Sequence, residues 1–278
     1  MSDLRAAGLR LACRWLGYRL ALAVPDEGWI TRLEAFTGLA MEDDSAAGAS
    51  PPALAITGER QAVVDGHDVR TFASAADLEA WLLLTVSDVM VDRGGFATIH
   101  AAAFLVADGA VLLAGPPYAG KSTLAAAARD RGIAVLGDDQ VRVDPDTGWV
   151  WPLPRPAKRR VEDAPAAAPP AAGALRARLD DELVDLAPRR GLASVDEGHR
   201  VARIVHLARH AGPGIRVATL EPFAATRGLL DQARVPGGDG IVTAAAIARR
   251  LGRAPALAMS VGDGEIGRAL QAVADPVS

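Results

Sequence analysis

Residues 110–132 place a short loop between an apolar run and an alanine-rich stretch, and this arrangement restricts the fold more than any other feature. The loop, Gly115-Pro-Pro-Tyr-Ala-Gly120-Lys121-Ser122, matches the pattern G-x-x-x-x-G-K-[ST]. The run AVLLAG before it predicts a buried strand, and KSTLAAAARDR after it predicts a helix that Gly132 ends. A strand–loop–helix unit of this kind indicates an α/β architecture.

The loop pattern is typical of one kind of chemistry. Glycines at both ends let backbone amides surround a phosphate at the positive end of a helix. Lys121 would place a compact positive charge against the β- and γ-phosphates of a nucleotide, and the Ser122 hydroxyl would ligate magnesium. The alternative is a strand-to-helix turn that matches the pattern by chance. The predicted nucleotide-binding residues are Gly115, Tyr118, Ala119, Gly120, Lys121, Ser122 and Thr123.

Two acidic residues, Asp138 and Asp139, follow the next apolar run, IAVL at 133–136. One carboxylate beside a phosphate loop can hold magnesium, and another can accept the proton of an attacking hydroxyl. Without the loop, the pair would be interpreted as an ordinary acidic turn after a strand. His100 opens the strand that leads toward the loop, and spacing alone favours a core histidine there.

Together these residues resemble the catalytic core of the HPr kinase/phosphorylase family. His100, the Asp108-Gly109 turn, the G-x-x-x-x-G-K-S-T loop and Asp138-Asp139 follow the order of the family's motifs. The intervals of 21 residues from His100 to Lys121 and 18 from Lys121 to Asp139 fit that arrangement without gaps. The resemblance is strong over 97–144, and RIVHL at 203–207 is similar to a later strand of the shorter HPr-kinase-like proteins.

The resemblance implies a role for each matching residue. Lys121 and the loop amides would hold the phosphates of ATP, while Ser122 and Asp138 would bind magnesium. Asp139 would accept the proton of a substrate serine, and His100 would lie in the active site beside Asp139 or a phosphate. The implied catalytic residues are therefore Asp139, His100 and Lys121, and the implied cofactors are ATP and Mg²⁺.

The sequence departs from the family pattern in two places. Tyr118 stands where the family has a glycine, and Pro116 and Pro117 lack amide donors. These positions lie early in the loop, so we expect the loop to tolerate them. The family's later glutamate metal ligand has no convincing counterpart, although Glu162 and Asp163 are candidate substitutes. Because this glutamate is missing, the resemblance gives less support to the family's reverse reaction, the phosphorylase activity. It also gives less support to HPr as the substrate.

The order of strands and helices predicts an α/β fold with a P-loop-containing, HPr-kinase/phosphoenolpyruvate-carboxykinase-like core and a small N-terminal α/β lobe. We expect the lobe over 1–95 and the kinase-like domain over 96–278. A proline- and alanine-rich stretch at 164–174 predicts a mobile loop beside the acceptor site.

Local patterns predict the individual elements. In 3–22, leucines lie among arginines, and we expect a helix that leads into a short strand. The Asp108-Gly109 pair predicts a hairpin, and VRV, PDTG and WVW predict another within 141–151. Further predictions are helices at 75–92, near 221–234, at 241–252 and at 263–274, and strands at 203–208 and 256–261.

Composition narrows the class of protein. The net charge of −4 over 278 residues argues against a nucleic-acid-binding surface. The one cysteine, Cys13, excludes a disulfide framework and fits a reducing compartment. The chain has no asparagine, so the magnesium-binding asparagine of ordinary protein kinases is missing. No stretch predicts a membrane span or a secretory signal, and we expect a cytoplasmic protein with no membrane partner. The sequence does not indicate the oligomeric state.

Basic residues and histidines give two further candidates. Only Lys121 and Lys158 of the 30 basic residues are lysines, which singles out Lys121 as a site where arginine does not fit. The basic cluster PRPAKRR at 154–160 would contact ATP phosphates or an acidic partner, or would be a solvated charge run. His206 and His210 have no evident third ligand and are interpreted as structural or exposed.

The sequence thus predicts an ATP- and Mg-dependent kinase that transfers a phosphoryl group to a serine-type hydroxyl on a protein or peptide. A precursor-peptide tailoring kinase is a special case of this prediction. Two alternatives stay open: a nucleotide-binding regulatory protein with little transfer activity, and a small-molecule kinase.

Overall fold

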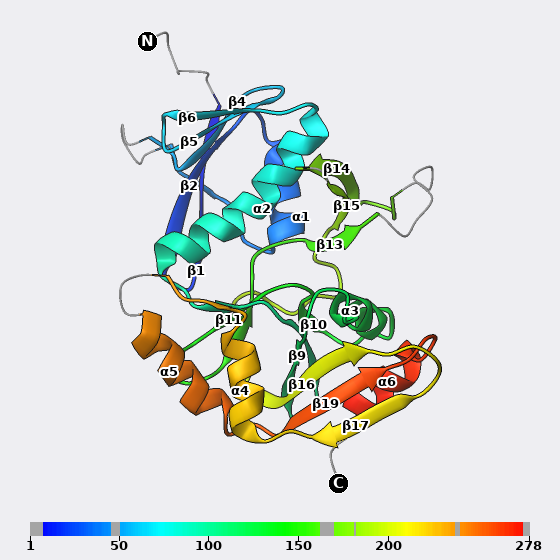
Figure 1. The fold of residues 1–278 in the computed structure, drawn as a ribbon. Coiled ribbons are helices and arrows are strands. Elements are labelled where there is room, and N and C mark those ends of the chain that lie inside the picture. Colours follow the sequence, from blue (N-terminus) through cyan, green and yellow to red (C-terminus); the bar gives the residue numbers. More distant parts are fainter. Residues whose placement is uncertain (1–7, 46–50, 162–169, 181, 237–239, 275–278) are drawn as a thin grey trace. The chain divides into compact units, whose positions relative to one another are not determined.

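A computed structural model describes residues 8–45, 51–161, 170–180, 182–236 and 240–274 of the chain (Figure 1). The protein is a mixed α/β protein with several sheets. It divides into two compact units, one made of Met1–Gly94 with Pro154–Arg190 and the other of Gly95–Leu153 with Gly191–Ser278. None of the helices within the described ranges has the length and apolar character needed to cross a bilayer.

The first unit contains a six-stranded sheet in the order β3-β1-β2-β4-β5-β6. Its strands are β1 (Leu9–Trp15), β2 (Tyr18–Val24), β3 (Glu42–Asp43), β4 (Leu54–Gly58), β5 (Gln61–Val64) and β6 (Asp68–Thr71). Helix α1 (Gly28–Thr37) follows β2, and helix α2 (Ala75–Gly94) confirms the helix predicted over 75–92.

The prediction of a helix within 3–22 is wrong, because β1 and β2 form an antiparallel hairpin there. Leu11, Cys13 and Trp15 are buried at alternate positions, which is the period of a strand. Leu16 and Gly17 both have positive φ, at 49° and 86°, as a two-residue hairpin turn requires. A leucine at such a position gives a weak turn signal, so the hairpin was not evident in the sequence.

A three-stranded sheet in the order β13-β15-β14 also belongs to the first unit, with β13 (Ala157–Arg160), β14 (Leu175–Leu179) and β15 (Glu182–Ala187). Helix α2 contacts β14, and the Asp77 carboxylate accepts a hydrogen bond from the Arg178 amide at 2.6 Å. The expected domain over 96–278 therefore differs from the compact units, since 154–190 returns to pack with the N-terminal segment. The expected mobile loop at 164–174 lies partly outside the described residues.

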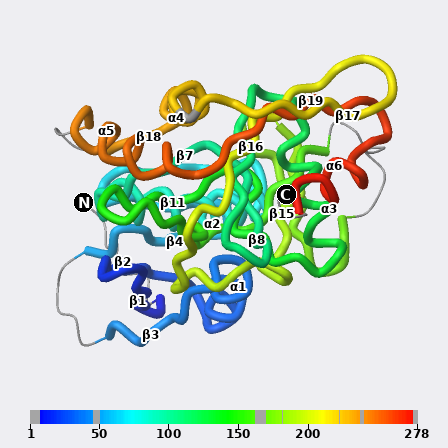
Figure 2. Tube along the Cα trace, turned by 90° about the horizontal axis from the view of Figure 1, so that it is seen from below, coloured from blue at the N-terminus to red at the C-terminus, as the bar shows by residue number. Residues whose placement is uncertain are grey.

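The second unit is organised around a six-stranded sheet in the order β10-β8-β9-β16-β19-β17. Its strands are β8 (Ala102–Val106), β9 (Gly109–Ala114), β10 (Val135–Gly137), β16 (Val201–Arg209), β17 (Ile215–Thr219) and β19 (Ala256–Val261). Strands β9, β16 and β19 are parallel. Strand β17 pairs antiparallel with β19 at one edge of the sheet, and Figure 2 shows these two segments side by side. The predicted hairpin at Asp108-Gly109 is confirmed by the pairing of β8 with β9.

Both faces of this sheet are covered. On one face Val111 and Leu113 pack with residues of helices α3 (Lys121–Asp130) and α6 (Ile266–Ala274). On the other face Leu112 packs with residues of helices α4 (Pro222–Leu230) and α5 (Gly240–Leu251). Neighbouring residues of β9 thus enter opposite apolar layers, which explains why the strand reads as a continuous apolar run rather than an alternating one.

A small four-stranded sheet in the order β12-β11-β7-β18 completes the second unit. It contains β7 (Thr98–Ile99), β11 (Val141–Val143), β12 (Val150–Pro152) and β18 (Ala233–Arg234). The β11–β12 hairpin confirms the second hairpin prediction. Strand β7 pairs antiparallel with both β11 and β18, so segments from three distant parts of the sequence meet at Ile99.

Candidate active site

The loop after β9 begins and ends at glycines that the backbone requires. Gly115 has φ +143°, and a Cβ atom there would lie 2.4 Å from the carbonyl oxygen of Leu207 on β16. Gly120 has φ +99° and is the N-cap of α3. Because glycine has no side chain, no side-chain cap comes from this position, and the first amides of α3 face the loop. The motif glycines are therefore explained by strand packing and by the helix start.

Lys121 is the first residue of α3, and its side chain folds back over the loop. Its Nζ atom donates hydrogen bonds to the carbonyl oxygens of Gly115 at 2.7 Å and Pro116 at 3.2 Å. The residue is 7% exposed. Burial lowers the pKa of the Lys121 ammonium from its usual value, and the nearby Asp139 carboxylate opposes that shift. The loop thus holds a buried cation against its own carbonyl groups.

The middle of the loop carries the residues that depart from the family pattern. Tyr118 has φ +63°, a left-handed conformation in which glycine is favoured, and it is exposed. Ala119 is buried and donates its amide to the Pro116 carbonyl at 3.3 Å. Thr123 is exposed on the first turn of α3. The departure at Tyr118 therefore keeps the backbone form that a glycine would adopt.

The side chain of Ser122 contacts the backbone of Asp138. The Ser122 hydroxyl donates to the backbone carbonyl oxygen of Asp138 at 3.1 Å. Asp138 directly follows the end of β10 at Gly137. The end of this strand therefore meets the start of α3, and the acidic pair stands beside the loop.

His100 and Asp139 are in direct contact. The imidazole Nδ1 of His100 lies 3.1 Å from Oδ1 of Asp139, with side chains 44% and 42% exposed. The contact follows from the small sheet, because Ile99 on β7 pairs with Val141 on β11 and the two chains continue past each other. The interpretation of His100 as a core histidine, drawn from spacing alone, is therefore wrong.

Metal binding is limited by the number of ligands. Among the residues that the structure describes, no group of three or more histidine, cysteine or acidic side chains is arranged to hold a metal ion. Magnesium is commonly held by one or two protein oxygens together with substrate phosphates and waters. The Ser122 hydroxyl and the adjacent acidic pair supply such oxygens, so the residues present fit Mg²⁺ together with a phosphate, rather than a metal held by protein alone.

Other residues considered in the sequence lie elsewhere. Lys158, Arg159 and Arg160 of the basic cluster belong to the first unit, and they form ion pairs with Asp185 or Glu182. Glu162 and Asp163 lie outside the described residues.

The two histidines interpreted as structural or exposed make hydrogen bonds to residues distant in the sequence. His206 Nε2 lies 2.9 Å from the Ala225 carbonyl oxygen, and His210 Nδ1 lies 2.8 Å from the Ser260 hydroxyl. These contacts join β16 to α4, and the residue after β16 to β19, which agrees with the structural interpretation.

Two residues near the loop were missed by the sequence reasoning. Arg209 ends β16, lies next to Gly120, and pairs with Asp263 at 3.4 Å. Its place at the carboxyl end of a parallel strand beside the loop is a signal that could have found it. Gln232 donates from Nε2 to the Gly115 carbonyl at 3.3 Å, and nothing in its local sequence pointed to that contact.

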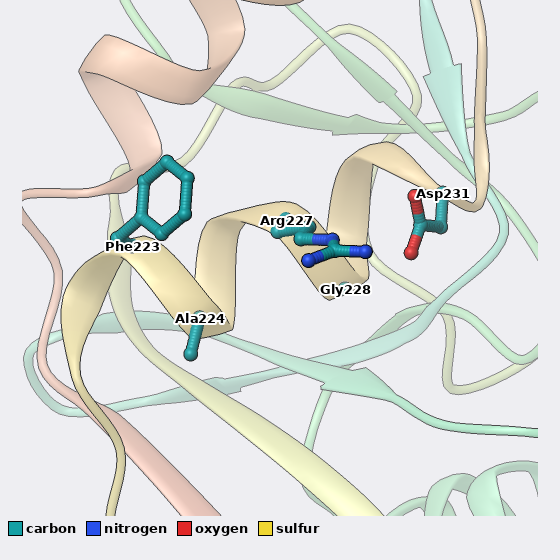
Figure 3. Close-up of a pocket in the computed structure, with 5 residues that line it drawn as sticks. All are labelled: Phe223, Ala224, Arg227, Gly228 and Asp231. Atoms are coloured by element: carbon teal, nitrogen blue, oxygen red, sulfur yellow. The ribbon is translucent and has the colours of Figure 1, made fainter.

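A surface hollow lies along helix α4. It is lined by Phe223, Ala224, Arg227, Gly228 and Asp231. Figure 3 shows the Phe223 ring at one end of the row and the Asp231 carboxylate at the other, with Arg227 between them. None of the predicted site residues lines this hollow.

The fold and the site define a mixed α/β protein in which a glycine-bounded strand–loop–helix turn adjoins an acidic pair and a histidine. Among solved structures, the chain is similar to the HPr(Ser) kinase/phosphatase from Coxiella burnetii, with 15% identity and a TM-score of 0.31. The similarity covers 63% of this chain and 92% of that one. No protein-family model matches the chain, and no curated protein matches it.

Proposed function

We propose that this protein is an HPr-kinase-like phosphotransferase that uses ATP and Mg²⁺ to phosphorylate a serine-type hydroxyl on a protein or peptide. The observation that carries this proposal is the position of Asp139, which contacts His100 and interacts electrostatically with Lys121. A carboxylate between a phosphate-binding cation and a histidine suits a group that removes a proton from an acceptor beside the γ-phosphate.

Nucleotide binding would use the loop and the start of α3. Lys121 would turn its ammonium from the loop carbonyls to the β- and γ-phosphates. A hydrogen bond between the positive ammonium and a negative phosphate is stronger than one to a neutral carbonyl. The amides at the start of α3 would donate to the same phosphates, helped by the positive end of the helix. Pro116 and Pro117 provide no amides, so donation depends on the second half of the loop.

Ser122 and Asp138 would hold magnesium on the side of α3 that faces the end of β10. When bound, the ion would neutralise charge on the phosphate oxygens of the nucleotide. The exposed hydroxyl of Ser122 and the adjacent Asp138 would orient the phosphates toward Asp139.

The transfer step would be an in-line displacement. The acceptor hydroxyl oxygen would form a bond to the γ-phosphorus as the bond from that phosphorus to the β,γ-bridging oxygen breaks, with ADP as the leaving group. The hydroxyl proton would pass to the Asp139 carboxylate. His100 would hold the Asp139 carboxylate through Oδ1, which directs the other oxygen to the acceptor.

The first experiment measures Mg-ATP binding by calorimetry in the wild type and in Lys121→Ala. Loss of a charge-assisted contact predicts roughly 10–100-fold weaker binding in the variant. Lys158→Ala is the matched control, because it removes the chain's other lysine, which pairs with Glu182 in the first unit. Equal affinity in the wild type and Lys121→Ala would refute the assignment of the loop.

The second experiment separates a kinase from a binding protein. The purified protein is incubated with γ-labelled ATP, magnesium and serine-containing peptides, and label on the peptides is measured. The altered loop positions, Pro116, Pro117 and Tyr118, favour the second candidate, a nucleotide-binding regulatory protein. ATP binding without label on any peptide or protein acceptor would support that candidate and reject the kinase.

A further inference from the structure

Gln232 links two parts of the candidate active site, although it belongs to none of its motifs. It lies between the end of α4 and the start of β18. Its side-chain Nε2 donates to the Gly115 carbonyl at 3.3 Å, and its own backbone carbonyl accepts the His100 amide at 2.9 Å. One residue therefore contacts both the first residue of the loop and the residue that holds Asp139.

The Gly115 carbonyl receives two side-chain donors at once. Lys121 Nζ donates to it at 2.7 Å, and Gln232 Nε2 donates to it at 3.3 Å. A carbonyl oxygen has two lone pairs and can accept both. Gly115 is buried, so the loss of a donor there is not freely replaced by bulk water.

The other end of the Gln232 carboxamide is unusual. Within the described residues, its Oε1 atom is buried and has no hydrogen-bond partner. A buried acceptor without a partner is unfavourable, and such groups in a native protein call for an explanation. The contact of Nε2 with Gly115 is what the side chain gains in return for leaving Oε1 unpaired.

We propose that Gln232 is a positioning residue that keeps the Gly115 carbonyl hydrogen-bonded when Lys121 turns away to bind a phosphate. The inference rests on the proposed nucleotide binding by Lys121. Without Gln232, the movement of Lys121 would leave the buried Gly115 carbonyl with neither of these side-chain donors. The free-energy cost of that unsatisfied carbonyl would make nucleotide binding weaker. Gln232 would thus lower the energetic cost of recruiting Lys121.

The pairing of β18 with β7 makes this arrangement stable. Ala233 pairs with Ile99, which places the preceding Gln232 opposite His100. The same strand β7 pairs with β11 on its other side. The donor to Gly115 is therefore held by the small sheet that also brings His100 to Asp139.

The test is a double-mutant cycle on Mg-ATP affinity, measured by calorimetry or by displacement of a fluorescent nucleotide. The four proteins are the wild type, Gln232→Met, Lys121→Ala and the double variant. Gln232→Met has a similar length but no donor, and we expect about 10-fold weaker binding. In the Lys121→Ala background the same change should alter the affinity by less than about twofold, because no lysine then has to leave Gly115.

Gln232→Glu is a second variant that keeps the size of the side chain. Its carboxylate cannot donate to Gly115 and would attract the Lys121 ammonium, so we expect at least the same loss of affinity. Thermal unfolding of each variant shows whether it is folded. If Gln232→Met folds but the unfolding transition of Gln232→Glu is lost, the cycle rests on Gln232→Met.

The outcomes separate this inference from the proposed function. If the wild type does not bind Mg-ATP, the proposed function fails and the inference fails with it. If the wild type binds but both Gln232 variants bind equally well, only the inference is overturned. An equal loss from Gln232→Met in both Lys121 backgrounds would also overturn it, because a purely structural residue would act independently of Lys121.

Discussion

The imidazole Nδ1 of His100 lies 3.1 Å from Oδ1 of Asp139, and strands β7 and β11 bring the two residues together. Both side chains are about half exposed, so solvent and an acceptor molecule can reach them. Asp139 also interacts with the Lys121 ammonium. Asp139, the proposed proton acceptor, therefore links His100 and Lys121 in one continuous arrangement within the second unit.

Asp139→Asn should retain nucleotide binding and lose phosphoryl transfer. A general base typically contributes about 10²–10⁴ to the rate, so we expect kcat to fall by that factor. The affinity for Mg-ATP should stay the same or increase, because the substitution removes a negative charge near the phosphates. Both quantities are measured with a peptide acceptor from the labelling experiment.

Asp138→Asn is the matched control for this prediction, since it changes the neighbouring carboxylate. It should weaken the dependence of nucleotide binding on magnesium, which Asp139→Asn should leave intact. Near wild-type transfer by Asp139→Asn would show that another group removes the proton.

Gly115→Ala should strongly destabilise the second unit. The new Cβ atom would lie 2.4 Å from the Leu207 carbonyl oxygen, at a φ of +143°. The clash and the strained backbone together predict a loss of about 3 kcal/mol or more in the free energy of unfolding. Gly132→Ala is the control, because that site has φ +76° but no atom within 4 Å of the new Cβ.

Gly132→Ala should therefore cost only the backbone strain, about 1 kcal/mol. Urea denaturation of both variants measures the difference. Equal losses would mean that the contact with Leu207 relaxes without cost.

Tyr118→Gly should stabilise the protein slightly or leave its stability unchanged. A left-handed conformation costs a non-glycine residue roughly 1–2 kcal/mol, and the added flexibility of glycine in the unfolded chain offsets about half of that. Tyr118→Ala removes the ring but keeps the strained backbone, so it should not show the gain. Thermal denaturation ranks the two, and a less stable Tyr118→Gly would show that the ring itself stabilises the loop.

Asp185→Asn should destabilise the first unit at neutral pH but not in acid. Hydrogen bonds from Arg176 and Arg159 lower the pKa of the Asp185 carboxyl below its usual value of 3.8. A depressed pKa contributes stability that is present above the unfolded pKa and is lost as the pH falls through the folded pKa. The penalty of the substitution should therefore shrink below about pH 4.

Urea denaturation of the wild type and Asp185→Asn at pH 7 and near pH 2.5 checks this prediction. Asp68→Asn is a control in the same unit, since the Asp68 carboxylate is exposed and its ion pair with Arg70 is exposed to solvent. A penalty for Asp185→Asn that does not change with pH would contradict the role of the Arg176 pair.

Local sequence was sufficient for the elements whose information lies within a few residues. The hairpin at Asp108-Gly109 and the helix beginning at Lys121 are specified by turn residues, apolar runs and a glycine at the helix end. The prediction of a helix within 3–22 was wrong because the leucines and arginines there fit both the helical and the strand period. Only the pairing of β1 with β2 decides between the two. The first unit's return segment, 154–190, is decided by contacts with α2 that no local pattern contains.

The sequence by itself determined the loop, the order of its motifs and the residue types that a phosphate and a metal would need. It also identified Asp138 and Asp139 as candidate site residues, because their position directly after a strand is a local property of the sequence. Only the tertiary structure decided that His100 contacts Asp139 and that Gln232 contacts Gly115. Those contacts depend on the pairing of β7 with β11 and β18, and strand partners far apart in a chain are selected by the packing of the whole sheet rather than by their own sequence.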